Sequence, residues 1–203
     1  NYLYLVFLKL INLFIMNFLH RLYLYSRLLP LSGVKRAAYL KKKKYLYHQG
    51  DNCNFTTMNF GTEPYLIKIH NNVEIASQVR FLTHDDSCLV LMNALKENVM
   101  LDKVGSIEIF DNCFIGANAL LMPNITIGPN SIVAAGSIVT KSIKPNTIVG
   151  GNPAREIGKF DEYSIKLNQS SKVLPWIGLL KDRKKNKAEI IKLKKEFFFK
   201  KNE

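Results

Sequence analysis

The sequence has little cysteine, histidine or tryptophan, and its few cysteines do not have the spacing of a zinc-binding fold. The chain of 203 residues contains three cysteines, four histidines and one tryptophan. Cys53, Cys88 and Cys113 are an odd number and form no CxxC or Cys/His pattern of the kind that holds zinc. We therefore expect free thiols in a reducing compartment, with Cys113 in the core.

Acidic residues are also scarce. Sixteen Asp and Glu stand against 29 Lys and Arg, which gives a formal net charge of +13. This balance suits anionic partners such as a phosphorylated cofactor, a membrane lipid or nucleic acid, although exposed lysines also occur on surfaces without a partner. We disfavour nucleic acid because the basic residues lie near the two ends of the chain and no recognised binding module is present.

Long apolar runs are absent except in residues 1–19, where Lys9, Asn12 and Asn17 interrupt the run. A membrane span is therefore not the first expectation, and the lack of a small-residue cleavage site disfavours a secretory signal. Residues 1–15 precede Met16 and fit either an upstream extension or part of an anchor. We expect residues 1–47 to form an apolar and basic helical extension that either caps the following domain or contacts a membrane.

A six-residue repeat dominates the middle of the chain. From Ile109 the sequence reads IFDNCF, IGANAL, LMPNIT, IGPNSI, VAAGSI, VTKSIK. A period of six is neither helical nor a simple strand alternation, so it indicates short strands wound as a solenoid. We expect this repeat domain over residues 48–158, an insertion loop over 87–105 where the period is lost, and a basic C-terminal extension over 159–203 that is partly helical.

Each position of the repeat has a physical role. The first residue is large and is expected to point inward, and the fifth is mostly small, as a tight corner requires. Glycine and asparagine are expected to mark left-handed turns. The first positions are Ile69, Ile75, Phe81, Ile109, Ile115, Leu121, Ile127, Val133 and Val139; the fifth are Val73, Val79, Cys113, Ala119, Ile125, Ser131 and Ser137; the turn residues are Gly116, Gly128, Gly136, Asn72, Asn112, Asn118, Asn124 and Asn130.

The segment IGANALLMPNITIGPNSIVAAGSIVTKSIKPNTIVGGNPARE resembles the hexapeptide-repeat acyltransferases, in particular the maltose and galactoside acetyltransferases and the O-acetyltransferases of capsule and lipopolysaccharide assembly. Its most specific pieces are AAGSIVTK, GGNPAR and, upstream, FLTHDDS. The resemblance implies a mainly β fold, a left-handed parallel β-helix with about three hexads per coil and helical extensions at both ends. It also implies a homotrimer that binds acetyl-CoA in the groove between neighbouring subunits and uses no metal.

His84 is the expected catalytic base. In FLTHDDS, Asp85 holds a corner position where a buried carboxylate is costly, so we expect the coil to open there. An imidazole of near-neutral pKa suits removal of a proton from a hydroxyl that attacks a thioester, and the catalytic histidine of the resembled family matches this position. Asp85, Asp86 or a backbone carbonyl could orient the ring, and Asp85 is preferred. Cys88 is disfavoured as a covalent nucleophile because a thioester is already activated.

The residues expected to bind the cofactor come from the resemblance. Ala117, Ala135, Thr140, Lys141 and Arg155 match the family's motif for acetyl-CoA. The small residues would let the pantetheine arm approach backbone amides. The two cationic residues would meet its phosphates, and a guanidinium can do so with two hydrogen bonds.

The sequence therefore predicts an acetyl-CoA-dependent O-acetyltransferase that acts on a saccharide hydroxyl of a capsule, lipopolysaccharide or related glycan precursor. The insertion loop and the aromatic residues near Phe60 and Tyr65 are the expected acceptor pocket. The alternatives are another small acceptor (serine, an amino sugar or an antibiotic) or a non-catalytic solenoid scaffold. A zinc hydratase of the carbonic anhydrase kind is disfavoured because His70 and His84 lack a third histidine ligand within the repeat. We expect a cytoplasmic protein and leave open a peripheral contact of the N-terminal segment with the inner membrane face.

Overall fold

The computed structural model of the chain describes residues 19, 22–95 and 100–199. It divides into two units, residues 1–158 and residues 159–203. The two alternatives for residues 1–15 concern a segment outside the described residues. Among the residues that are described, no helix combines the length and the apolar character that crossing a bilayer requires.

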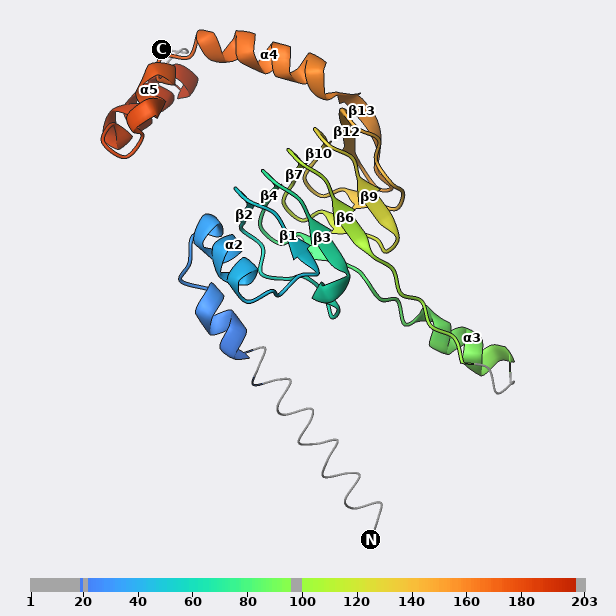
Figure 1. Cartoon of the computed structure of the whole chain (residues 1–203). Helices are drawn as coiled ribbons and strands as arrows, with labels where there is room; N and C mark the ends of the chain where they lie inside the picture. Colours follow the sequence, from blue (N-terminus) through green and yellow to red (C-terminus); the bar gives the residue numbers. More distant parts are fainter. Residues whose placement is uncertain (1–18, 20–21, 96–99, 200–203) are drawn as a thin grey trace. The chain divides into compact units, whose positions relative to one another are not determined.

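The first unit is a solenoid of parallel strands in which three strands make one coil (Figure 1). Successive strands pass through three sheets, so each sheet takes one strand from nearly every coil. The first sheet holds β1 (His48–Gln49), β3 (Ile67–Ile69), β6 (Ile107–Ile109) and β9 (Ile125–Ile127). The second holds β2 (Asn54–Phe55), β4 (Glu74–Ile75), β7 (Phe114–Ile115), β10 (Ile132–Val133), β12 (Thr147–Gly150) and β13 (Arg155–Lys159), and the third holds β5 (Arg80–Phe81), β8 (Leu120–Leu121) and β11 (Ile138–Val139).

The register of neighbouring strands confirms three hexads per coil. Ile115 of β7 lies opposite Val133 of β10, which is 18 residues later and therefore three hexads along the chain. Leu121 of β8 lies opposite Val139 of β11 with the same separation. The repeat of the sequence is thus the repeat of the backbone hydrogen bonds.

The core consists of the inward positions that the hexads predict. All nine first-position residues are at most 1% exposed, and all seven fifth-position residues are at most 2% exposed. Cys113 is among them, as expected, and its thiol donates to the carbonyl of Gly128 in the next coil. Burial raises the pKa of the Cys113 thiol to about 11, so it is an inert core residue.

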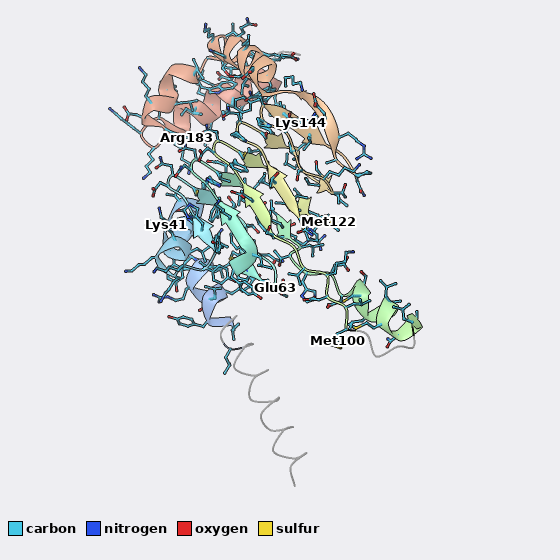
Figure 2. All side chains as sticks on the ribbon, turned by 45° about the vertical axis from the view of Figure 1, so that its right-hand side comes forward. Lys41, Glu63, Met100, Met122, Lys144 and Arg183 are labelled. Atoms are coloured by element: carbon cyan, nitrogen blue, oxygen red, sulfur yellow. The ribbon has the colours of Figure 1, made fainter. Side chains whose placement is uncertain are left out.

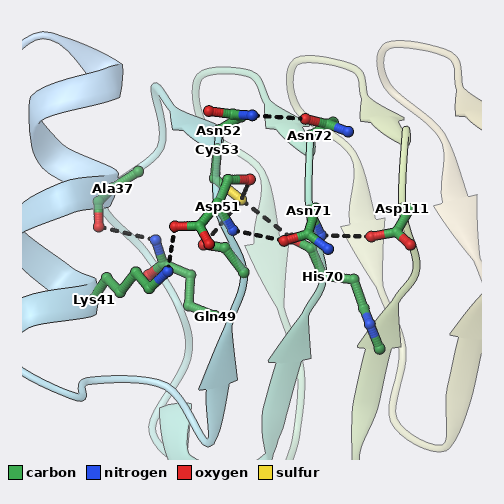
Figure 3. A network of polar contacts seen from close by, with 11 residues as sticks. Ala37, Lys41, Gln49, Asp51, Asn52, Cys53, His70, Asn71, Asn72 and Asp111 are labelled. Carbon is green, nitrogen blue, oxygen red and sulfur yellow. Dashed lines mark hydrogen bonds and ion pairs between the residues drawn. The ribbon is translucent and has the colours of Figure 1, made fainter.

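Asparagine marks one corner of every coil. The five predicted asparagines adopt φ between 55° and 60°, a left-handed conformation that asparagine tolerates better than most residues. At one of these corners the side-chain amides also bind one another from coil to coil at 3.0–3.3 Å, and Figure 3 shows the first step of this ladder. The ladder runs through Asn52, Asn72, Asn112, Asn130 and Asn146.

The glycines have two different roles, and the prediction was correct for only one of them. Gly136 has φ of +70°, as a left-handed turn requires. Gly116 and Gly128 are not left-handed, so the prediction for these two was wrong. A Cβ on Gly116 would lie 2.4 Å from the backbone nitrogen of Ala135, and a Cβ on Gly128 would lie 2.6 Å from that of Pro145. These two glycines are required because the next coil leaves no room for a side chain.

The N-terminal segment covers the first coil of the solenoid. Residues 22–28 are helical, and α2 (Gly33–Lys42) packs on β2 with Ala37 and Leu40 buried. Arg36 is only 6% exposed, and its guanidinium donates to the carbonyls of Leu28, Leu31, Phe55 and Thr56. This cationic side chain therefore joins the two helical stretches to the second strand of the first coil.

Side chains along α2 add further contacts with the first coil (Figure 3). The amide of Gln49 donates to the carbonyl of Ala37, and Lys41 pairs with Asp51. The described part of the extension thus takes the capping role, one of the two roles expected for it. Its other described basic residues, apart from the buried Arg36, are exposed.

The insertion between β5 and β6 is helical in part, so the expectation of a loop over its whole length was wrong. It contains α3 (Ser87–Leu95), which projects away from the coils in both views (Figures 1 and 2), and Figure 2 labels Met100 on the same arm. The chain returns at Val104, which forms an antiparallel bridge with His84. A short helix, η1 (Pro64–Leu66), precedes β3.

The second unit consists of α4 (Phe160–Lys172), η2 (Ile177–Asp182) and α5 (Lys187–Phe199). The helix predicted in the lysine-rich segment is confirmed as α5. Trp176 and Ile190 are each 5% exposed, and the ring of Trp176 meets that of Phe197 edge to face at 5.3 Å. These side chains form the small core of this unit.

We expect Gly116→Ala to lower the free energy of unfolding by about 1–3 kcal/mol, because its methyl group has to displace the backbone of the neighbouring coil. Gly158→Ala is the matched control, since a Cβ there meets nothing within 4 Å. Urea unfolding followed by circular dichroism measures both variants. Equal stability of the two would contradict the close approach of the coils.

Candidate functional site

A pocket of about 850 Å³ opens where the third sheet meets the N-terminal helices. His84, three residues after the end of β5, lies in its wall. Coil residues from Met58 to Glu63 and from Arg80 to Thr83 provide most of the remaining surface, and Leu24, Tyr25 and Tyr45 come from the N-terminal segment. The candidate base is thus open to solvent within a concave site.

Glu63 holds the imidazole of His84 from the opposite wall. Its Oε1 lies 3.3 Å from Nδ1 of His84, at a separation of 21 residues in the chain. The Glu63 side chain is only 16% exposed, and its other oxygen, Oε2, is buried with no hydrogen-bond partner among the described residues. A carboxylate that accepts from Nδ1–H leaves the lone pair of Nε2 for chemistry.

Two further carboxylates lie at the other ring nitrogen. Nε2 of His84 is 3.2 Å from Oδ1 of Asp86 and 3.8 Å from Oδ1 of Asp102. The hydrogen bond with Glu63 raises the pKa of His84, desolvation opposes it, and the negative charges of Asp86, Glu63 and Asp102 raise it further. The site is therefore built to stabilise an imidazolium, which is the state that a general base reaches after it takes a proton.

Asp85 has a different role from the one preferred from the sequence. Its carboxylate pairs with Lys103 and accepts the backbone N–H of Ser87, and no contact with His84 is recorded for it. The hydrogen bond from Lys103, followed by that from Ser87, lowers the pKa of Asp85 to about 2. Asp85 therefore joins the start of α3 to the returning strand, and the carboxylate at Nδ1 of His84 is Glu63.

Sequence reasoning did not find Glu63, although a weak signal was present. It is the only acidic residue between Asp51 and Glu74, and it lies in GTEPYL, a stretch that departs from the hexads. A departure from the repeat also singled out His84. The two irregular segments meet in space because both leave the solenoid at the same end of the third sheet.

The acceptor pocket differs in part from the expectation. Phe60 does line the pocket, and its ring stacks on Phe81 at 5.3 Å. Tyr65 and the described insertion residues, 87–95 and 100–105, are not among the lining residues. Cys88 is buried and also lies outside this wall. Tyr45 and Arg80 line the pocket, a role that the insertion was expected to have.

The residues expected to bind the cofactor flank the third sheet. Ala117 and Ala135 each follow a paired strand of the second sheet by two residues, so they occupy the same corner in successive coils. Gly136 N–H donates to the carbonyl of Ala117, which confirms that these turns are adjacent. Both alanines are at least partly exposed, and thus their backbone can be approached from outside.

Thr140 and Lys141 follow the carboxyl end of β11, as His84 follows the carboxyl end of β5 in the same sheet. Phe81, Leu121 and Val139 are aligned across β5, β8 and β11, so the turn after β11 lies two strand spacings from the turn after β5, or about 10 Å along the axis. Arg155 follows Ala154, whose N–H donates to the carbonyl of Ile138 at the start of β11. Thr140, Lys141 and Arg155 are all exposed.

These residues are not in the pocket of His84 within one chain. None of Ala117, Ala135, Thr140, Lys141 and Arg155 is among its lining residues. Within the described part of the chain, no group of three or more His, Cys, Asp or Glu is arranged to hold a metal ion.

The outward residues differ among the three sheets. On the first sheet the outward positions are polar and in register: Lys68, Glu108 and Thr126. On the second and third sheets the outward positions of the later coils are apolar: Phe114, Ile132 and Ile148, and Leu120 and Ile138. In the earlier coils the same positions hold Asn54, Glu74 and Arg80. An exposed apolar ladder is typical of a surface that another chain covers.

Comparison with known proteins agrees with this architecture. Residues 106–141 match the family described as bacterial transferase hexapeptide (six repeats). Protein CapG of Staphylococcus aureus is 37% identical over 134 residues, which cover 64% of this chain and 76% of CapG. A chloramphenicol acetyltransferase of Agrobacterium fabrum is 41% identical over 73 residues, which cover 36% of this chain and 35% of that protein.

A solved structure of a maltose O-acetyltransferase from Clostridium difficile 630 is also similar, with 32% identity and a TM-score of 0.44 over 55% of this chain and 58% of that one. The chain spans less than half the length of several of the curated relatives it matches. The match with CapG, by contrast, covers most of each of the two chains. The chain therefore belongs to the hexapeptide-repeat transferases, and its fold is the left-handed parallel β-helix of that family with helical extensions at both ends.

Proposed function

We propose that this protein is an acetyl-CoA-dependent O-acetyltransferase that moves an acetyl group to a hydroxyl of a saccharide. The observation that carries the proposal is the pairing of His84 with the largely buried Glu63 in the wall of an open pocket. The similarity to a chloramphenicol acetyltransferase supports acetyl transfer as the reaction class. A capsule, lipopolysaccharide or related glycan precursor is the proposed source of the acceptor.

In the proposed reaction, His84 is the general base and Glu63 orients it. The carboxylate of Glu63 accepts Nδ1–H, so Nε2 receives the proton of the acceptor hydroxyl. The hydroxyl oxygen bonds to the thioester carbonyl carbon, the carbon–sulfur bond breaks, and the imidazolium returns the proton to the leaving thiolate. Asp86 and Asp102 lie near the charged ring and stabilise it during transfer.

Two exposed cations, Lys141 after β11 and Arg155 at the start of β13, are the proposed phosphate ligands. Among the described residues no acidic side chain pairs with either of them, and both lie on the coils that follow His84. An exposed surface of this kind forms a groove once a second chain covers it. The apolar outward residues of the second and third sheets support a homotrimer in which acetyl-CoA lies between neighbouring subunits.

The pocket chemistry supports a polar acceptor of several hydroxyl groups. Arg80, Asn59 and Thr62 supply hydrogen-bonding groups, and Tyr25 and Tyr45 supply aromatic surface. A wall that combines aromatic faces with spaced polar groups suits a sugar ring, which has apolar faces and a polar rim. This acceptor pocket adjoins the proposed base.

We expect His84→Ala to reduce acetyl transfer by about 10²–10⁴-fold while the dissociation constant for CoA stays unchanged, because the base is lost and the phosphate ligands are not. Thiol release with a saccharide acceptor measures the first quantity, and calorimetry with CoA measures the second. His48→Ala, an exposed histidine outside the pocket, is the control. Retained turnover in His84→Ala contradicts the assignment.

The pH profile tests the role of Glu63. Because the base acts in its neutral form and Glu63 raises its pKa, the rate should rise with pH through a limb above the ordinary imidazole value of about 6.5. Glu63→Gln should move this limb to lower pH and also lower the plateau, since the ring loses its orientation. Asp85→Asn should leave the limb in place. If the limb moves in Asp85→Asn and not in Glu63→Gln, then Asp85 orients the ring and the role given to Glu63 is wrong.

Lys141→Gln should raise KM for acetyl-CoA about tenfold and leave KM for the acceptor unchanged, because one charged contact to phosphate is lost. Initial rates over a matrix of both substrates separate the two constants. Lys172→Gln, an exposed lysine of the second unit, should change neither constant. An equal effect of both variants would show that only the general positive charge matters.

A further inference from the structure

The N-terminal fifty residues carry charge of only one sign. They contain nine basic residues, and the first acidic residue of the chain is Asp51. Seven of the nine fall within residues 22–47, which we call the N-terminal surface. The nine are Lys9, Arg21, Arg27, Lys35, Arg36, Lys41, Lys42, Lys43 and Lys44.

Apolar and aromatic side chains are exposed among these charges. Leu29 is 68% exposed and Tyr47 is 75% exposed, and three more large apolar residues of the N-terminal surface exceed half exposure. These three are Leu22, Tyr23 and Val34. Leucine and tyrosine side chains mixed with lysine and arginine are typical of helices that lie in the boundary between lipid headgroups and acyl chains.

The N-terminal surface is fixed to the solenoid and adjoins the pocket. Leu28 is fully buried, and Arg36 binds carbonyls on both the helical segment and the first coil. Leu24 and Tyr25 line the pocket that contains His84, and they lie on the helical stretch that begins with the exposed Leu22 and is followed directly by the exposed Leu29. Whatever binds the N-terminal surface therefore lies beside the mouth of the candidate active site.

We propose that the N-terminal surface docks on an anionic lipid bilayer, and that the acceptor is a saccharide carried on a lipid of that bilayer. The second half of this proposal rests on the proposed acetyl transfer, and the first half does not. A bilayer is favoured over a second copy of the chain because two such surfaces, with basic residues and no acidic ones, repel each other. Anionic headgroups attract the exposed lysines and Arg27, whereas the buried Arg36 stays bound within the protein, and the exposed apolar side chains enter the headgroup layer.

Sedimentation with vesicles tests the docking without any substrate. The full chain should sediment with vesicles of phosphatidylcholine that contain phosphatidylglycerol, and much less with vesicles of phosphatidylcholine alone. The triple variant Lys42→Gln, Lys43→Gln, Lys44→Gln should weaken binding about a hundredfold, because three attracted charges are removed. The double variant Leu22→Ser, Leu29→Ser should also weaken it at least about tenfold.

Two controls in the second unit match these variants in type and exposure. Lys184→Gln, Lys185→Gln, Lys187→Gln removes three exposed lysines, and Ile165→Ser, Leu167→Ser removes two exposed apolar side chains. Both controls should retain most of their binding to the vesicles that contain phosphatidylglycerol. The proposal is overturned if the controls lose as much affinity as the test variants, if neutral vesicles bind equally well, or if no vesicle binds. It is also overturned if light scattering shows that the test variants change the oligomeric state while their vesicle binding stays the same.

The acceptor is tested separately with a saccharide supplied either on a lipid in the vesicles or free in solution. If the proposal is correct, Lys42→Gln, Lys43→Gln, Lys44→Gln lowers transfer to the lipid-borne acceptor and leaves transfer to the free one unchanged. Equal losses with both acceptors overturn the link between docking and acceptor. Vesicle binding without transfer to either acceptor would contradict the proposed function and leave the docking intact.

Discussion

The stacking of one coil directly on the next is the constraint on which the rest of this structure depends. Backbone N–H groups of each coil donate to carbonyls of the next, and the inward side chains fill the narrow space that remains. The spacing leaves no room for a Cβ at Gly116 or Gly128 and places asparagines close enough to form a ladder. Because each coil is held on both sides, the strands can be as short as two residues and still stay in register.

The candidate site lies where this stacking is interrupted. The chain leaves the coils before η1 and again after β5, and the two departures bring Glu63 to His84 from 21 residues away. Three carboxylates around one imidazole are unfavourable unless the ring holds a proton for part of the reaction, which is what a general base requires. The regular coils place the turn that carries Lys141 two strand spacings from the turn that leads to His84.

The N-terminal segment both covers the first coil of the solenoid and lines the candidate site. An uncovered first coil would expose its core, and the N-terminal helices prevent this with Leu28, Ala37 and Leu40. Among the described residues no carboxylate pairs with the buried Arg36, and carbonyl oxygens from both the helices and the coil surround its guanidinium instead. The same helices form a wall of the pocket, so covering the core and shaping the site are tasks of one segment.

The sequence by itself determined the solenoid, its inward residues and the asparagine turns, because a repeat records the local environment of each residue separately. Its resemblance to a known family supplied the expectation of three hexads per coil. The sequence also singled out His84 as a residue that departs from the repeat. Only the tertiary structure decided that Glu63 rather than Asp85 contacts the ring and that Asp85 pairs with Lys103. It also decided that residues 87–95 form a helix and that a neighbouring coil requires a glycine at position 116. These facts depend on where a broken coil re-enters the stack and on which segments then meet, and a local pattern does not contain that information.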